Sequence, residues 1–174
     1  MRPTSDRVRE AMFDILGSLG GVEGATVLDL FAGTGALGIE ALSRGAAHVT
    51  FVEIDRVSLA ALAHNLRATG LSSGQDSGQA YRIVRADALA WLASGQEWAD
   101  VAFCDPPYRY DKWPQLLGAL RARIAVLESD REVDLPESMV PHRVYRYGGT
   151  LVTLAKARHP AGDSPHGAES KGEA

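Results

Sequence analysis

Cysteine is almost missing from this sequence, since Cys104 is the single one among 174 residues. One cysteine excludes an internal disulfide and a cysteine-based metal site within one chain. Its position inside an apolar run indicates a buried, unreactive thiol. We therefore expect no metal site in this protein.

Long apolar segments are missing as well. No run approaches the roughly 18–20 residues that cross a membrane, and residues 1–6 lack the apolar core of a signal peptide. These absences lead us to expect a cytoplasmic protein with no membrane partner.

An excess of basic charge is also absent. The net charge is −4, from 18 Lys and Arg against 22 Asp and Glu, which argues against binding of nucleic acid by bulk electrostatics. A local basic rim is still compatible with this balance, because Arg2, Arg7 and Arg9 cluster near the start. Asp6 and Glu10 offset part of that charge. Composition alone leaves the substrate open.

The pattern of apolar residues alternates between strand and helix periods over a length typical of one globular domain. The predicted strands are Ala25–Phe31, His48–Glu53, Tyr81–Arg85, Val101–Cys104, Ile124–Leu127, Val144–Tyr147 and Thr150–Leu154. Helical segments separate the first five, and the glycine pair between the last two indicates a hairpin. We expect a Rossmann-like α/β fold: a mostly parallel seven-stranded sheet that ends in an antiparallel hairpin, with helices on both faces.

Glycine, proline and polar residues indicate the boundaries of the domain, of its first helix, of a loop and of the tail. Residues 1–157 are predicted to form one domain, and residues 1–20 hold a helix that Thr4 or Ser5 caps and Gly20-Gly21 ends. Residues 71–79 are rich in Ser, Gly and Gln, which predicts a mobile surface loop. Residues 158–174 have, apart from Pro, no apolar residue larger than Ala, which predicts a disordered tail.

A glycine-rich loop follows the first strand. Residues 33–38 match the letters G-x-G-x-x-G, and with Glu53 they fit a dinucleotide-binding fingerprint loosely. Asp29 lies four residues before Gly33, where its carboxylate would repel a pyrophosphate but would suit a cationic ligand. S-adenosylmethionine is such a ligand, with an ammonium, a sulfonium and no phosphate.

Two further acids lie at strand ends on the same edge of the predicted sheet. Glu53 could accept hydrogen bonds from both hydroxyls of a ribose. Asp87 could accept one from an adenine amino group, with Ala88 beside the ring, or it could only cap the following helix. Because parallel strands end at one edge of a sheet, we expect Asp29, Glu53 and Asp87 to meet at one crevice.

The run Asp105-Pro106-Pro107-Tyr108 follows a buried strand. Two prolines cannot continue a strand or begin a helix freely, so the chain leaves the sheet in a stiff turn. The Asp105 carboxylate and the Pro106 carbonyl are left as acceptors, and the Tyr108 ring lies beside them. Two acceptors and a ring suit a planar group with an NH₂, such as a base that has been unstacked.

In this order, these residues resemble class I S-adenosylmethionine-dependent methyltransferases that methylate amines. More narrowly, residues 2–10 (RPTSDRVRE) and 29–46 (DLFAGTGALGIEALSRGA) are similar to the bacterial 16S rRNA guanine-N2 methyltransferase family of the RsmD type. The resemblance covers residues 2–156. Members usually have a basic, glycine-rich segment before the Arg-Pro-Thr run. The given sequence begins at that run.

The resemblance implies a single class I methyltransferase domain with S-adenosylmethionine as cofactor, and methyl transfer to N2 of a guanine in 16S rRNA within an assembling small subunit. We expect a monomer. The catalytic residues would be Asp105, Pro106, Pro107 and Tyr108. Cofactor binding would involve Asp29, Phe31, Gly33, Gly35, Glu53, Asp87 and Ala88. Thr4 and Arg7 would lie over the cofactor or the target nucleotide, on a helix above the active site.

Other functions remain open at this point. The same corner, the turn of residues 105–108, could also bind adenine N6 in DNA or RNA, or a protein glutamine. The enzymes that modify glutamine have a similar turn, but with Asn in place of Asp105. An NAD-dependent oxidoreductase fits the glycine loop, but Asp29 and the Pro-Pro turn count against it. A non-catalytic RNA-binding module would need more positive charge.

Overall fold

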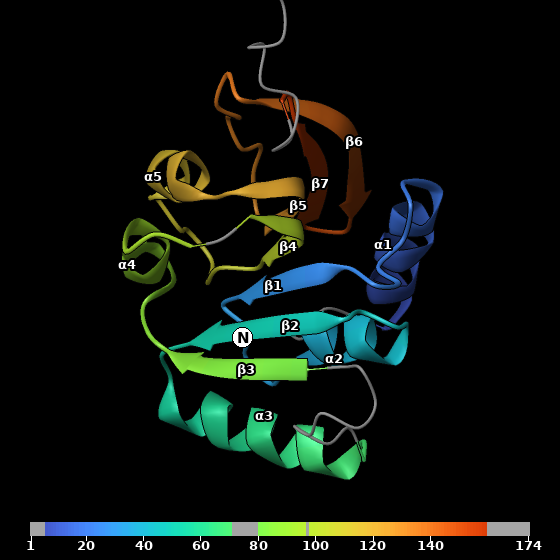
Figure 1. Cartoon of the computed structure of the whole chain (residues 1–174). Coiled ribbons are helices and arrows are strands. Elements are labelled where there is room, and N and C mark those ends of the chain that lie inside the picture. Colours follow the sequence, from blue (N-terminus) through green and yellow to red (C-terminus); the bar gives the residue numbers. More distant parts are fainter. Residues whose placement is uncertain (1–5, 71–79, 97, 160–174) are drawn as a thin grey trace, which may run out of the picture.

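The computed structural model describes residues 6–70, 80–96 and 98–159 (Figure 1). The helices are α1 (Asp6–Ser18), α2 (Ala36–Ser43), α3 (Arg56–Ala68), α4 (Ala88–Ala93) and α5 (Trp113–Ala119). The strands are β1 (Thr26–Leu30), β2 (His48–Glu53), β3 (Ala80–Arg85), β4 (Ala99–Cys104), β5 (Ala122–Ser129), β6 (Met139–Tyr147) and β7 (Thr150–Ala157).

These strands form one seven-stranded sheet in the order β3-β2-β1-β4-β5-β7-β6. Strands β1 to β5 are parallel, and β7 is antiparallel to both of its neighbours. The predicted fold class is therefore confirmed, hairpin included. From β1 the chain builds the sheet outward to β3 and then crosses back to β4 on the other side of β1. Ligands of open α/β sheets bind where the strand order reverses in this way, at the carboxyl ends of the strands.

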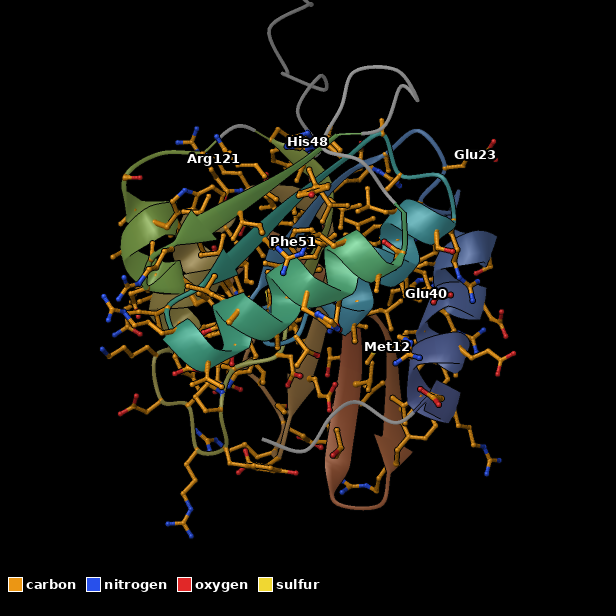
Figure 2. The ribbon with its side chains drawn as sticks, turned by 90° about the horizontal axis from the view of Figure 1, so that it is seen from below. Met12, Glu23, Glu40, His48, Phe51 and Arg121 are labelled. Carbon is orange, nitrogen blue, oxygen red and sulfur yellow. The ribbon has the colours of Figure 1, made fainter. Side chains whose placement is uncertain are left out.

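Apolar residues on alternate positions of each strand fill two cores, one on each face of the sheet. On β1 and β4, Val27 and Phe103 belong to the core under α1, α2 and α3. Leu28 and Cys104 belong to the core under α4 and α5, which confirms the buried thiol. Figure 2 shows the face of the sheet that α1, α2 and α3 cover, with α3 in front of the sheet and α1 to its side.

The hairpin is longer than the sequence predicted. Strand β6 begins at Met139 instead of Val144, and it continues through Pro141 with a register shift between Pro141 and Arg143. Proline lacks the N–H that a ladder needs, and β6 tolerates it because this strand lies at the edge of the sheet and is irregular there. The local pattern around Pro141 therefore concealed the first half of the strand.

Arg158 lies at the boundary predicted for the tail. Its backbone N–H donates to the Ser138 carbonyl at 2.7 Å, and its Nε donates to the Glu137 carbonyl at 2.8 Å. The rest of the predicted tail from residue 160, the predicted loop at 71–79, and the predicted cap at Thr4 or Ser5 lie outside the described residues. No helix in the described part of the chain is long and apolar enough to cross a membrane.

Candidate active site

The chain turns sharply where β1 ends. Phe31 has a φ of 61°, and Gly33 and Gly35 have φ values of 57° and 85°. A left-handed backbone is unstrained for glycine but costs roughly 1–3 kcal/mol at a residue such as Phe31, and such strain is concentrated at functional sites. The glycine loop therefore has the conformation that the sequence pattern requires at Gly33 and Gly35.

Glu53 is buried at the end of β2, directly behind this loop. Its Oε2 accepts a hydrogen bond from the Gly33 N–H at 2.8 Å. Its Oε1 accepts from the N–H groups of Ile54 and Asp55, both at 2.8 Å. The carboxylate thus joins the β1–α2 loop to the β2–α3 turn, a structural role that the sequence did not indicate. Its contact with a ribose stays a prediction.

Asp29 is buried within β1, under the first turn of α2. Its Oδ2 accepts a hydrogen bond from the Gly38 N–H at 2.9 Å. Burial raises the pKa of Asp29 to about 8, and the nearby charges of Asp105 and Glu53 add to that rise. A cation close to Asp29 would lower this pKa and offset the penalty of burying the charge.

Asp87 caps α4 with its side chain. Its Oδ1 accepts a hydrogen bond from the Ala90 N–H at 2.9 Å, and Ala88 is buried as the first residue of the helix. The capping alternative is therefore realised, while Asp87 itself is exposed beside the strand edge. The expected adenine contact of Asp87 and Ala88 stays a prediction.

Asp105 follows the end of β4 and is half-buried. Within the described part of the chain, no N–H or O–H donates to its carboxylate. Burial raises the pKa of Asp105 to about 7, and the negative charge of Glu128 adds to the rise. The corner thus holds an acceptor whose protonation changes near neutral pH and which is open to a ligand.

A cavity of about 250 Å³ opens beside Asp105. Its walls come from the Pro-Pro turn, from α5 and from the ends of the strands around β5. The lining residues are Asp105, Pro106, Pro107, Tyr108, Tyr110, Trp113, Glu128, Ser129, Asp130 and Thr150. The structure therefore brings the whole predicted catalytic run into one cavity, whose lining includes both carboxylates and aromatic rings.

Aromatic rings connect this cavity to the end of β1. The ring of Phe31 packs edge-on against Tyr110 at 5.3 Å between centroids, and Tyr110 packs against Trp113 at 5.6 Å. Tyr108 is 59% exposed and lies at the cavity mouth. The sequence analysis missed Tyr110 and Trp113 as site residues, although both lie within eight positions of Asp105.

The predicted substrate residues near the N-terminus are only partly described. Thr4 lies outside the described residues. Arg7 is exposed on α1 and makes no ion pair within the described part of the chain. α1 is fixed by its opposite face, where Phe13 packs against Phe103 of β4 at 5.5 Å between ring centroids.

Comparison with known proteins identifies the family. The family model described as "Conserved hypothetical protein 95" matches residues 1–156. The chain belongs to this family. The chain is 38% identical to YlbH of Bacillus subtilis, which is provisionally named an rRNA methyltransferase. The match extends over 167 residues and covers 90% of this chain and 88% of that protein.

A named protein and a solved structure, both from Escherichia coli, extend the similarity. Ribosomal RNA small subunit methyltransferase D is 42% identical over 109 residues, which cover 63% of this chain and 50% of that protein. The solved structure of yhhF, provisionally named a methyltransferase, superposes with a TM-score of 0.78 at 33% identity and covers 90% of this chain and 88% of that one. These matches confirm the resemblance to the RsmD type and the class I methyltransferase fold.

Proposed function

We propose that this protein uses S-adenosylmethionine to transfer one methyl group to the exocyclic N2 amine of a guanine in 16S rRNA, as a monomer in the cytoplasm. The observation that supports this most directly is the cavity at the Pro-Pro turn, where the half-buried Asp105 carboxylate has no donor among the described residues. The family's rRNA methyltransferases supply the substrate class.

The acids at the strand edge fit the cofactor. Four acids lie at or near the carboxyl ends of four neighbouring strands: Asp87 at β3, Glu53 at β2, Asp29 at β1 and Asp105 at β4. Carboxylates accept hydrogen bonds and attract cations, so they suit an ammonium, ribose hydroxyls and an adenine amine better than a pyrophosphate. S-adenosylmethionine supplies an electrophilic methyl group on its sulfonium. An NAD-binding function is correspondingly disfavoured.

The corner residues would act on the acceptor amine. The Asp105 carboxylate and the Pro106 carbonyl would accept its two N–H groups, which orients the amine and favours a pyramidal nitrogen. The Tyr108 ring would stack on the base at the cavity mouth. The new N–C bond would form as the methyl–sulfur bond breaks, with S-adenosylhomocysteine as the leaving group. The methylated nitrogen would then be acidic, and its proton would pass to Asp105 or to water. A pKa of about 7 suits Asp105 to receive that proton near neutral pH.

Methyl transfer from radiolabelled S-adenosylmethionine to 16S rRNA would test this function. Naked rRNA and partly assembled small subunits are offered separately, from cells that lack the modification. Nucleoside analysis by mass spectrometry should find N2-methylguanosine. N6-methyladenosine would instead support the adenine alternative, and label in ribosomal protein would support a glutamine acceptor. Absence of transfer to every substrate, with S-adenosylhomocysteine bound, would contradict the rRNA assignment.

A further inference from the structure

The end of β5 places a second carboxylate beside Asp105. Cys104 of β4 pairs in parallel register with Leu127 of β5, and Asp105 and Glu128 are the residues that directly follow this pair in the sequence. Both residues line the same cavity. Of these two carboxylates, the function proposed above uses only that of Asp105 and assigns no role to Glu128.

Two adjacent carboxylates present acceptors and, when ionised, no donor. Guanine has an N1–H directly beside its N2 amine, so these two neighbouring groups present donors only. Adenine and cytosine also have an exocyclic amine, but each has a ring nitrogen with a lone pair beside it. A lone pair facing a carboxylate leaves two acceptors unpaired, which is a penalty that a matched guanine avoids.

The other walls of the cavity discriminate poorly between bases. Tyr110 and Trp113 present aromatic surface, and every base has a face that can stack on a ring. Pro106 offers a carbonyl acceptor that any exocyclic amine satisfies. Selection of guanine therefore needs a polar group that faces the neighbour of the amine, and Glu128 lies on the wall next to Asp105.

We propose that Glu128 accepts the N1–H of the guanine whose N2 amine Asp105 holds, and that this contact selects guanine over adenine and cytosine. This inference rests on the proposed function, because it needs methyl transfer to a base. Glu128 would bind the substrate without taking part in bond making.

The base analogue 2-aminopurine isolates this contact. It keeps the 2-amino group but has an unprotonated N1, so it meets Asp105 as guanine does and presents a lone pair to Glu128. An RNA with the mapped target guanosine is compared with the same RNA in which 2-aminopurine replaces it. The unmodified enzyme should prefer guanine in kcat/KM by roughly 10- to 100-fold, the penalty of an unpaired buried acceptor.

The variant Glu128→Gln should reduce this preference toward equality, because the glutamine amide can donate to the unprotonated N1. The matched control Asp130→Asn removes the same charge from the same cavity wall and should keep the guanine preference. Heat denaturation and S-adenosylhomocysteine titration of both variants exclude unfolding as the cause.

Two other outcomes overturn the inference. If the unmodified enzyme methylates guanine and E128Q keeps the full preference, Glu128 does not select the base, while the proposed function stands. If mapping places the methyl group on an adenine amine, both the inference and the guanine assignment fail.

Discussion

Glu53 Oε2 accepts a hydrogen bond from the Gly33 N–H at 2.8 Å, between residues 20 positions apart in the sequence. The acid at the end of β2 therefore fixes the glycine loop that follows β1. Because Oε1 of the same carboxylate also accepts from Ile54 and Asp55, one buried side chain holds both turns of the expected cofactor crevice.

Glu53→Gln should destabilise the fold and weaken cofactor binding. The amide has one acceptor oxygen, so its NH₂ group would face a backbone N–H and leave it unpaired, which costs about 1–3 kcal/mol. Denaturant unfolding measures the loss, and calorimetric titration with S-adenosylhomocysteine measures binding. The control Glu40→Gln breaks only the exposed pair with Arg44 and should cost less than about 1 kcal/mol. Equal stability of the two variants would contradict this role of Glu53.

Asp29→Asn should flatten the dependence of stability on pH. Because burial raises the pKa of Asp29 from 3.8 to about 8, the folded chain binds this proton more tightly than the unfolded chain does. Stability from this group is therefore full at low pH and falls as pH rises from about 4 to about 8. Asn keeps the acceptor for Gly38 and removes the charge.

The measurement is the midpoint of thermal unfolding at about pH 5 and about pH 8. The midpoint should fall less between these conditions in D29N than in the unmodified chain, and Asp105 accounts for part of the slope that remains. The exposed Asp14→Asn serves as a charge-matched control. An identical slope in D29N and the unmodified chain would mean that Asp29 does not titrate in this range.

Asp105→Ala should abolish methyl transfer and leave cofactor affinity nearly unchanged. The substitution removes the acceptor for the amine from the target cavity, while the glycine loop and Glu53 are untouched. Transfer assays and S-adenosylhomocysteine titration separate the two effects. Loss of both together would assign Asp105 to the cofactor or to the fold instead of the acceptor.

Methyl transfer should rise with pH through about 7 and then level off. Ionised Asp105 accepts hydrogen bonds at both oxygens, whereas its protonated form must donate at one, so the active form prevails above its pKa. Because the charge of Glu128 helps to raise this pKa, Glu128→Gln should move the rising limb to lower pH. A limb at the same pH in both enzymes would show that Asp105 does not control it.

Gly38→Ala should destabilise the protein strongly. An added Cβ would lie 2.3 Å from the Phe51 ring and 2.9 Å from Asp29 Oδ2, and overpacking of this kind costs typically 1–3 kcal/mol. Figure 2 labels Phe51 next to α3. The control is Gly118→Ala in α5, where the added Cβ would meet no atom within 4 Å apart from the backbone of its own helix. This change should be neutral or stabilising by about 0.4–1 kcal/mol. Chemical denaturation compares the two.

Local signals predicted the fold well where periodicity and turn residues agree. The strand, glycine loop and helix around Gly33, the Pro-Pro turn after Cys104, and the hairpin at Gly148 all have short-range causes. The start of β6 was mispredicted because Pro141 reads locally as a strand breaker, and the edge position that tolerates it depends on the order of strands in the sheet.

The sequence by itself determined the residues that end β2, β3 and β4 and the backbone positions that require glycine. The tertiary structure decided the partners of those residues. Glu53 meets Gly33, Asp29 meets Gly38, and Glu128 lies beside Asp105 because strand order and register bring them together. Local periodicity specifies the faces of a strand, but it does not encode which strand lies next to it. The acids therefore form a site only because the parallel sheet aligns the carboxyl ends of the strands that carry them.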